Sequence, residues 1–397
     1  MTNIHRRQFL GLAGVATLAG MLPRFAFAAV PGERRFVFVI LRGGLDGLAA
    51  VVPHGDPNYR DKRQRLALEA ATTLPLATGF GLHPSLKFMQ RSWDTGELAI
   101  LHAASTPYRE RSHFDGQDVL ESGATGVFAT SDGWLNRALG TLPKASGIAI
   151  ANSIPLVLRG AAPATSWAPS FAPAPADDTL NRLLDLYAGD PLLGPALASA
   201  VDTATLMEEQ GSTSPDGRVR QGRGAGPQAY RLLASSAATL LGAEGGPCAA
   251  VLEFDGWDTH ANQGAAEGGL AQRLAGLDAA LAALHDGLGP RWGNTVVIAA
   301  SEFGRTVAEN GTGGTDHGTG GIAFVLGGAV RGKRLLGDWP GLAAKALHQG
   351  RDLAPANDLR ALFASALHGQ LGVERGALTT TVFPGLKDPI RFPDLIT

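Results

Sequence analysis

Five short segments of the chain are apolar at nearly every position, and this pattern constrains the fold more than any other feature of the sequence. Strands that are covered on both faces have this pattern, because neither face meets water. Amphipathic helical patterns lie between the segments; in the clearest, leucines from Leu270 to Leu284 recur four and three residues apart. Buried strands that alternate with helices predict an α/β fold: a mostly parallel central sheet with helices on both faces. The five segments are Phe36 to Leu41, Leu98 to Ala104, Ala249 to Phe254, Val296 to Ala300 and Ile322 to Leu326.

The middle of the chain differs from its two ends. Residues 160–176 are rich in Ala and Pro and residues 210–227 in Gly, Ser and Arg, which predicts two surface loops. Between them, Leu180 to Met207 has a helical pattern that breaks at Pro191. We therefore expect a single domain over residues 29–397 that carries a helical insertion at about residues 155–230. Near the end of the chain, a helix is expected from Asp358 to Leu371, with Asn357 or Asp358 as its cap.

The first 28 residues have the three parts of a cleavable export signal. A basic stretch with Arg6 and Arg7 precedes an apolar run from Phe9 to Leu22, and Ala-Phe-Ala follows at residues 26–28. The run RRQFL at residues 6–10 resembles the twin-arginine signature; the alternative is an ordinary secretion signal with two adjacent arginines by chance. The apolar run is too short and too rich in Gly and Ala to span a bilayer comfortably. We expect export by the twin-arginine machinery, as a folded protein without a permanent membrane span, to the periplasm or the cell surface.

Composition narrows the range of functions. The chain has one cysteine, Cys248, so it cannot form an internal disulfide even in an oxidising compartment. Its 34 basic and 36 acidic residues give a net charge of −2, and no basic run beyond the first residues could follow a phosphate backbone. Nucleic acid is therefore not an expected partner. The sequence also lacks the motifs of α/β-hydrolase esterases, phosphate-loop nucleotide hydrolases and CxxC proteins.

Polar clusters stand next to the apolar segments. In open parallel sheets, functional groups gather just beyond the carboxyl ends of the strands, where the loops converge. Singly, each cluster has a plain structural explanation: Asp46 holds a turn, Ser112 caps a helix, and Asp258 and His260 bond to the backbone. Together they indicate one site, because Asp, Glu and neutral His bind zinc or manganese, and a serine at a helix start is a candidate nucleophile. The clusters are RGGLDG at 42–47, RSHFDGQD at 111–118, DGWDTH at 255–260, SEFGR at 301–305 and TDHG at 315–318.

These five motifs together resemble an exported bacterial family catalogued only as a domain of unknown function, family 1501. That family is placed in the alkaline-phosphatase-like superfamily, with the sulfatases and the cofactor-independent phosphoglycerate mutases. The resemblance covers about residues 35–390, nearly the whole of the mature chain. It implies an alkaline-phosphatase-like fold with two divalent metals around a serine, threonine or formylglycine nucleophile, and hydrolysis or transfer of phosphate or sulfate esters.

The resemblance also implies roles for individual residues. Asp46 matches the metal-binding aspartate after the first strand, and Ser112 corresponds in place to the nucleophile. Asp258 and His260 resemble the paired ligands of one metal, although the superfamily separates this pair by three residues and here only one intervenes. His317 resembles the later histidine of the same metal.

One motif departs from the superfamily pattern. After the fourth strand, superfamily members carry Asp-His-Gly, whereas this chain has Glu-Phe-Gly at residues 302–304, and Phe303 cannot bind a metal. The first metal keeps the three ligands just named. The second keeps only Asp46, Glu302 and Ser112, so one divalent ion (zinc, manganese or calcium) is favoured over two.

A different alignment is open at the glycine-rich loop. Asp316 and His317 could themselves be the displaced Asp-His pair, and both alignments stay open at this point. The remaining histidines are expected to be structural: His54, His83, His102, His285, His348 and His368.

Two functions fit these observations. The first is a metal-dependent hydrolase or transferase whose substrate is an anionic small-molecule or polymer ester of phosphate or sulfate. In it Ser112 attacks, Arg111 or Arg305 binds the anion, and His113 acts as an acid or base or only packs. The second is a catalytically degenerate envelope protein for binding or assembly that keeps the fold and at most one metal; Phe303 motivates it. A third, a polysaccharide or lipid-linked substrate gripped by the insertion, depends only on the position of the insertion.

Overall fold

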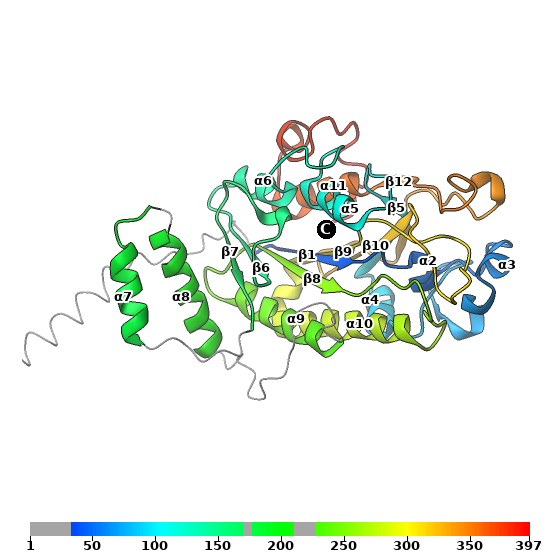
Figure 1. Cartoon of the computed structure of the whole chain (residues 1–397), viewed down its shortest axis with the longest axis horizontal. Helices are drawn as coiled ribbons and strands as arrows, with labels where there is room; N and C mark the ends of the chain where they lie inside the picture. Colours follow the sequence, from blue (N-terminus) through cyan, green and yellow to red (C-terminus); the bar gives the residue numbers. More distant parts are fainter. Residues whose placement is uncertain (1–32, 170–176, 192, 210–226) are drawn as a thin grey trace, which may run out of the picture.

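The computed structural model describes residues 33–169, 177–191, 193–209 and 227–397. The expected export signal at residues 1–28 lies outside these ranges, as do residues 170–176 and 210–226 of the two expected loops. Over the described ranges, the chain forms three layers, with a sheet between two sets of helices (Figure 1).

A nine-stranded sheet forms the middle layer. Its strands lie in the order β11-β5-β10-β9-β1-β8-β6-β7, and β12 pairs with β5. All five predicted strands are part of this sheet, and the predicted mostly parallel arrangement is confirmed: of the strands described in it, β10 alone runs antiparallel to its neighbours. The bounds are β1 Arg35–Arg42, β5 Leu98–Ser105, β6 Gly147–Ile150, β7 Ala164–Trp167, β8 Ala249–Asp255, β9 Thr295–Ala300, β10 Gly321–Leu326, β11 Arg334–Leu336 and β12 Asn357–Asp358.

The direction of β10 decides where its preceding loop lies. Ala323 near the start of β10 pairs with Ala300 at the end of β9, and Gly321 pairs with Ala104 at the end of β5. The glycine-rich loop before β10 therefore reaches the same sheet edge as the loops that follow β1, β5, β8 and β9. Five loops distant in sequence meet there.

The side chains of β1 show how the sheet is covered on both faces. Phe36 and Phe38 pack into one core cluster together with Trp134, whereas Val37 and Val39 pack into a second cluster on the other face. Figure 1 shows α5, α6 and α11 on the first face and α4, α9 and α10 on the second. Because both faces are buried, the strand carries apolar side chains at consecutive positions. The helices are α4 Lys87–Asp94, α5 His113–Ser122, α6 Trp134–Gly140, α9 Pro227–Gly242, α10 Gly269–Leu288 and α11 Leu359–Leu371.

Both helices predicted outside the insertion are confirmed. The leucines from Leu270 to Leu284 form the buried face of α10. The helix α11 begins at Leu359, and its cap is Asp358, whose carboxylate accepts a hydrogen bond of 2.9 Å from the backbone N–H of Arg360.

The segment predicted to be a helical insertion holds two helices, α7 (Asp177–Tyr187) and α8 (Leu193–Glu209), on either side of the predicted break at Pro191. They stand at the left of Figure 1 beside β7. The loop predicted for residues 160–176 is wrong at residues 164–167, because β7 is a strand of the central sheet. As the last strand in the order, β7 is only half-buried, so its sequence Ala-Thr-Ser-Trp lacks the apolar run that reveals the inner strands.

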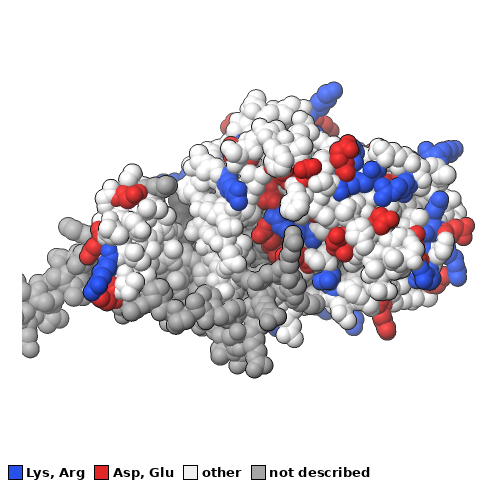
Figure 2. Space-filling model, in the orientation of Figure 1, with Lys and Arg blue, Asp and Glu red and all other residues white. Residues whose placement is uncertain are grey.

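Smaller elements complete the described chain. A three-stranded sheet joins β2 (Val51–Val52), β4 (Gly81–Leu82) and β3 (Leu74–Pro75), with α2 (Gly47–Ala50) and α3 (Tyr59–Arg63) nearby in sequence. The remaining helical turns are η1 Gln64–Leu66, η2 Ala70–Thr72, η3 Leu156–Leu158, η4 Gly289–Asn294, η5 Ala344–Ala346, α12 Arg375–Ala377 and η6 Leu378–Val382. No helix in the described ranges has the length and apolar character needed to cross a bilayer. On the face shown in Figure 2, acidic and basic side chains are intermixed.

Candidate metal centre

Three side chains from three of the predicted clusters converge at the edge where the loops meet. His113 begins α5, Asp258 follows β8, and His317 lies in the loop before β10. One ligand atom of each lies within 4.8 Å of the other two. Nε2 of His113 is 3.4 Å from Oδ2 of Asp258, and Nε2 of His317 is 3.2 Å from Oδ1 of Asp258. Two imidazoles and a carboxylate form a donor set typical of zinc and related transition metals.

The spacing of these atoms fits a bound cation. A tetrahedral zinc ion with bonds of about 2.0–2.1 Å separates its donors by about 3.3–3.4 Å. The contacts from the two oxygens of Asp258 to the two histidines, at 3.4 and 3.2 Å, are close to this spacing. In addition, Nε2 of His113 is buried, and its contact with Oδ2 of Asp258 at 3.4 Å is not a well-formed hydrogen bond. A buried polar atom that lacks a good hydrogen bond is costly. A metal ion would provide that partner, so the residues fit the ion that the motifs imply.

His260 lies next to this set. Its Nε2 is 2.9 Å from Nε2 of His317 and 3.0 Å from Oδ1 of Asp258, so the structure brings the predicted Asp258–His260–His317 group together. The other ring nitrogen, Nδ1, is 3.1 Å from Oδ1 of Asp316. Asp316 therefore contacts the ring nitrogen of His260 that points away from His317. The carboxylate that contacts the Nε2 atoms of His260 and His317 is that of Asp258.

Charge around the centre favours the metal-binding forms of two of its donors, Asp258 and His317. Burial of Asp258 opposes its ionisation, but the hydrogen bond and charge of Arg305, with the charges of His260 and His113, lower the pKa of Asp258. Nη1 of Arg305 donates to Oδ1 of Asp258 at 2.7 Å, and the guanidinium also donates to the backbone of Thr315. Burial, with the charges of His113 and Arg305, lowers the pKa of His317 and favours its neutral imidazole.

Glu302 binds the ring nitrogen of His113 that does not face Asp258. Nδ1 of His113 donates to Oε1 of Glu302 at 2.8 Å, and the backbone N–H of Gly43 donates to the same oxygen at 2.8 Å. Since Nδ1 is held in this way, Nε2 is the nitrogen that faces Asp258. Burial disfavours the charged form of His113, but the hydrogen bond and charge of Glu302, with the charge of Asp258, raise its pKa. The structure thus places Glu302 as a partner of a candidate ligand.

Phe303, the residue that departs from the superfamily pattern, packs against the ligands. Its ring centroid is 4.9 Å from that of His113 and 5.2 Å from that of His317. A Cβ atom on Gly44 would stand 2.8 Å from the Phe303 ring, and one on Gly116 would stand 3.1 Å from it. Two glycines therefore make room for an aromatic wall that fixes the orientation of both imidazoles.

The structure does not bring Asp46 to this group. Asp46 is fully buried, and Nη2 of Arg63 donates to its Oδ1 at 2.8 Å, while Nε2 of Gln263 donates to its Oδ2 at 2.7 Å. Burial opposes ionisation, but the charge and hydrogen bonds of Arg63 lower the pKa of Asp46. The carboxylate also accepts the backbone N–H of Ala49 as the cap of α2. Its oxygens are already engaged within the fold.

Ser112 and Arg111 lie at the start of α5. Ser112 occupies the cap position, yet its side chain makes no capping hydrogen bond, so the helix does not use its hydroxyl. Arg111 has a left-handed backbone (φ +65°), a conformation that costs free energy for a non-glycine residue. Its carbonyl oxygen is 3.0 Å from Nδ1 of His317, which directs the other nitrogen of that ring to Asp258. The guanidinium of Arg111 donates to Asp352 at 2.9 Å, so neither Arg111 nor Arg305 is without a carboxylate partner.

The site described above agrees with a family assignment from sequence. Residues 92–382 match a family described as a protein of unknown function (DUF1501). This range is well over half of the chain and includes every residue of the candidate centre.

The chain belongs to the DUF1501 family.

Solved structures resemble this DUF1501 protein at low sequence identity. The chain is similar to Ps i-CgsB in complex with k-i-k-neocarrahexaose, with 9% identity, coverage of 86% of this chain and 73% of that chain, and a TM-score of 0.39. It is also similar to a phosphonate monoester hydrolase of Agrobacterium radiobacter, with 12% identity, 86% and 74% coverage and a TM-score of 0.37. A third is the C-terminal periplasmic domain of EcEptC from Escherichia coli in complex with Zn, with 10% identity, 76% and 74% coverage and a TM-score of 0.35. A comparison with curated proteins found no match.

Sequence reasoning missed three contributions to the site of this DUF1501 protein. His113 was expected to act as an acid or base or to pack, whereas its position makes it a candidate ligand; its place directly after Ser112 in the second cluster is the signal that could have shown this. Arg63, which neutralises Asp46, and Asp352, which holds Arg111, belong to no motif. Only their positions in the folded chain reveal them.

Proposed function

We propose that this protein is a metal-dependent hydrolase or transferase that acts on phosphate or sulfate esters. The observation that supports this proposal most is the convergence of His113, Asp258 and His317, whose ligand atoms lie within 4.8 Å of one another. Catalytic zinc sites use three protein ligands and leave the remaining coordination to water or substrate, and His113, Asp258 and His317 would supply three such ligands. The two nitrogen donors favour zinc or manganese over calcium, which prefers oxygen ligands. A bound ion of this kind supplies Lewis-acid stabilisation of the ester oxygens and lowers the pKa of a nearby hydroxyl or water.

The residues of the chain then have separate tasks in this proposal. Ser112 is the assigned nucleophile. It directly precedes the candidate ligand His113 in the chain, and its hydroxyl makes no capping hydrogen bond to α5. Arg305 keeps Asp258 ionised through its hydrogen bond. Glu302 holds Nδ1 of His113, and the carbonyl of Arg111 holds Nδ1 of His317. Each of these contacts orients a ligand before any substrate arrives.

Metal content tests the centre directly. We expect about one equivalent of zinc or manganese per chain by elemental analysis of the purified protein, because one group of donors converges in the described residues. His113→Ala and Asp258→Asn should each lose the ion. His54→Ala is the matched control, since His54 has no partner in the described structure and lies outside the centre. Retention of the metal by both ligand variants would overturn the assignment.

Turnover tests the reaction. The metal-loaded protein is incubated with a panel of phosphate and sulfate esters, and product release is measured for the wild type, Ser112→Ala and the control Ser235→Ala on α9. We expect turnover in the wild type and in Ser235→Ala and a large loss in Ser112→Ala. Turnover that is unchanged in Ser112→Ala would show that the nucleophile is a different group.

A second candidate function has its own support. Asp46 is already neutralised by Arg63, and Phe303 stands where the superfamily has a ligand, so a second metal lacks donors. A catalytically degenerate protein that binds or assembles envelope components is consistent with a single ion. Two tightly held ions per chain would argue against this alternative, and so would turnover of any ester in the panel.

We also propose that the protein reaches the periplasm or the cell surface through the twin-arginine machinery. The support is the run RRQFL at residues 6–10, followed by an apolar segment and Ala-Phe-Ala at residues 26–28. Fractionation of cells that express the full chain tests this. The double substitution Arg6→Lys and Arg7→Lys should leave the precursor in the cytoplasm, whereas Lys387→Arg should not change export. Export of the double variant at the wild-type level would exclude this route.

A further inference from the structure

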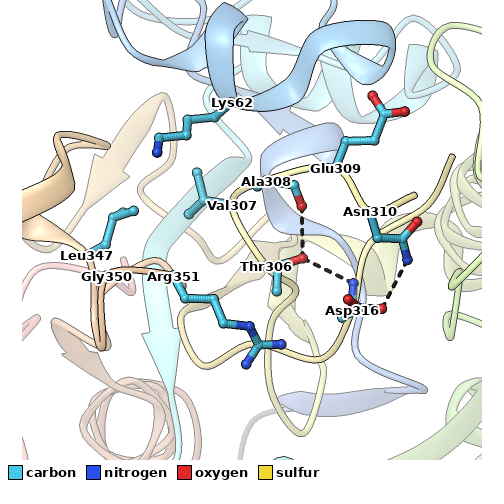
Figure 3. A pocket seen from close by; sticks show the side chains of 10 residues that line it. All are labelled: Lys62, Thr306, Val307, Ala308, Glu309, Asn310, Asp316, Leu347, Gly350 and Arg351. Carbon is cyan, nitrogen blue, oxygen red and sulfur yellow. Dashed lines mark hydrogen bonds between the residues drawn. The ribbon is translucent and has the colours of Figure 1, made fainter. Parts of the chain in front are cut away.

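A pocket of about 230 Å³ lies close to the candidate metal centre, and Figure 3 shows the side chains that line this pocket. Asp316 lines the pocket and also contacts Nδ1 of His260, at 3.1 Å, so the pocket and the centre share a wall. Arg351 lines it as well, and its Nη2 donates to the backbone carbonyl of His317 at 2.7 Å. Pockets that enclose a whole small-molecule ligand measure about 300–1,000 Å³. This pocket is therefore of a size to accept one group of a larger substrate whose reacting end lies at the metal.

The acidic side chains that line the pocket have partners. The carboxylate of Glu309 accepts hydrogen bonds from the side chain and backbone of Arg65, at 2.6 and 3.0 Å. That of Asp316 accepts from Asn310 at 3.0 Å and contacts His260. The charge of Asp316 also interacts with that of Arg351, and Glu309 is paired with Arg65, so neither acid is engaged with Lys62.

The basic side chains that line the pocket are less completely paired. Lys62, on α3, is half-buried, and in the described part of the chain its ammonium group makes no hydrogen bond or ion pair. Arg351 is 3.6 Å from Oδ1 of Asp352, but the other oxygen of Asp352 already has Arg111 at 2.8 Å. Figure 3 shows Lys62 and Arg351 reaching the pocket from different segments, with Val307 between them in the view. The pocket thus combines an unneutralised cation with an apolar surface.

We propose that this pocket binds a second anionic group of the substrate, a carboxylate, phosphate or sulfate borne by the part of the ester that is not attacked. In this proposal Lys62 contacts the anion, and Arg351 adds a second positive charge on the side of the pocket next to His317. Val307 and Leu347 contact the carbon skeleton that joins the two groups. The proposal rests on the proposed function for its substrate class, because it selects esters that carry a further negative charge.

Binding of inorganic phosphate to the metal-free protein tests the pocket without any turnover. The full protein is dialysed against a chelator, so that the metal centre cannot hold the anion, and is titrated with phosphate by calorimetry at low ionic strength. We expect Lys62→Gln to weaken binding about tenfold or more, since a hydrogen bond to a charged group is lost. Lys62→Arg should retain binding, and Lys387→Gln, a surface lysine far along the chain, should bind like the wild type.

Absence of phosphate binding to the metal-free wild type would overturn the proposal, as would equal binding by Lys62→Gln. A second measurement compares phenyl phosphate with its 4-carboxy derivative. Lys62→Gln should raise KM for the carboxylated ester at least about tenfold and reduce the preference for it, with kcat retained. If no ester is turned over, the proposed function fails, while the phosphate titration still decides whether the pocket binds anions.

Discussion

The buried ion pair between Asp46 and Arg63 offers the sharpest test of how this site is built, because sequence and structure assign Asp46 different roles. The motif places Asp46 among the metal ligands. In the structure, both partners are almost fully buried, at 0% and 1% exposure, and the Asp46 carboxylate accepts hydrogen bonds from Arg63 and Gln263. The substitution Arg63→Met keeps an unbranched apolar stem and removes the guanidinium group with its charge.

The structure sets the size of the expected effect. Arg63→Met leaves the Asp46 carboxylate buried without its counter-charge, and loss of one partner of a buried pair costs about 3–5 kcal/mol. That is a large fraction of the roughly 5–15 kcal/mol that stabilises a typical domain. The double variant Asp46→Asn, Arg63→Met removes both charges, so we expect it to be more stable than Arg63→Met alone. Urea unfolding followed by circular dichroism measures the free energies of the wild type, Asp46→Asn, Arg63→Met and the double variant, and the coupling between the two positions follows from this cycle.

The sign of the pH dependence adds a second measurement. In the wild type, Arg63 holds the pKa of Asp46 below its ordinary value, so this pair stabilises the fold above the unfolded pKa of Asp and the contribution is lost as pH falls through the lower folded pKa. In Arg63→Met, the largest contribution that offsets burial is lost, and we expect the folded pKa of Asp46 to rise above the unfolded one. The variant should therefore be least stable at neutral pH and regain stability relative to the wild type as the pH falls toward about 4.

Two results would refute this reasoning. A cost of less than about 1 kcal/mol for Arg63→Met would show that Asp46 is not a buried, uncompensated charge in the variant. Loss of bound metal in Asp46→Asn, without loss of stability, would show that Asp46 is a ligand after all. The matched control is Arg334→Met, because Arg334 is exposed and its guanidinium bonds only to a backbone carbonyl in the described structure.

Three further predictions concern other parts of the molecule. Glu302→Gln should weaken metal binding about 10–100-fold in a chelator competition, because it loosens the hydrogen bond that orients His113; an unchanged affinity would show that the contact is not needed. Burial lowers the pKa of His102 to about 3, whereas the unfolded chain takes up this proton near pH 6.5, so His102 costs stability as the pH falls from about 6.5 to about 3, at up to about 1.4 kcal/mol per pH unit. His102→Phe should therefore lose less stability than the wild type over this range in urea unfolding, and parallel curves would contradict the assignment. Trp134→Ala should cost about 3–5 kcal/mol, since Trp134 is fully buried and stacks on Phe363 at 4.6 Å; a cost below about 1 kcal/mol would mean that the core on this face refills the space.

Much of the fold follows from local patterns in the sequence. The strands from β1 to β10 that lie inside the sheet are apolar at consecutive positions because both faces are covered, and this requirement is visible in the residues themselves. The period of the leucines predicts α10 for the same kind of reason. The edge strand β7 escapes the pattern because it is only half-buried, and its Ala-Thr-Ser-Trp resembles the loops around it. The local sequence thus predicts a strand where both faces of that strand are fully buried, and fails to predict one that is only half-buried.

For the candidate centre, the sequence identifies the kinds of donor but not which of the carboxylates are free to bind a metal. The donor types and their loops were visible in the sequence, since Asp258, His260 and His317 are the kinds of side chain that bind metals and flank predicted strands. Which carboxylates remain available was decided only by tertiary packing: Arg63 reaches Asp46 from α3, and Glu302 turns to Nδ1 of His113. Both choices depend on contacts between segments far apart in the chain. A carboxylate that is buried must take whatever cation or donor the fold brings within hydrogen-bonding distance, and residue type alone does not specify that neighbour.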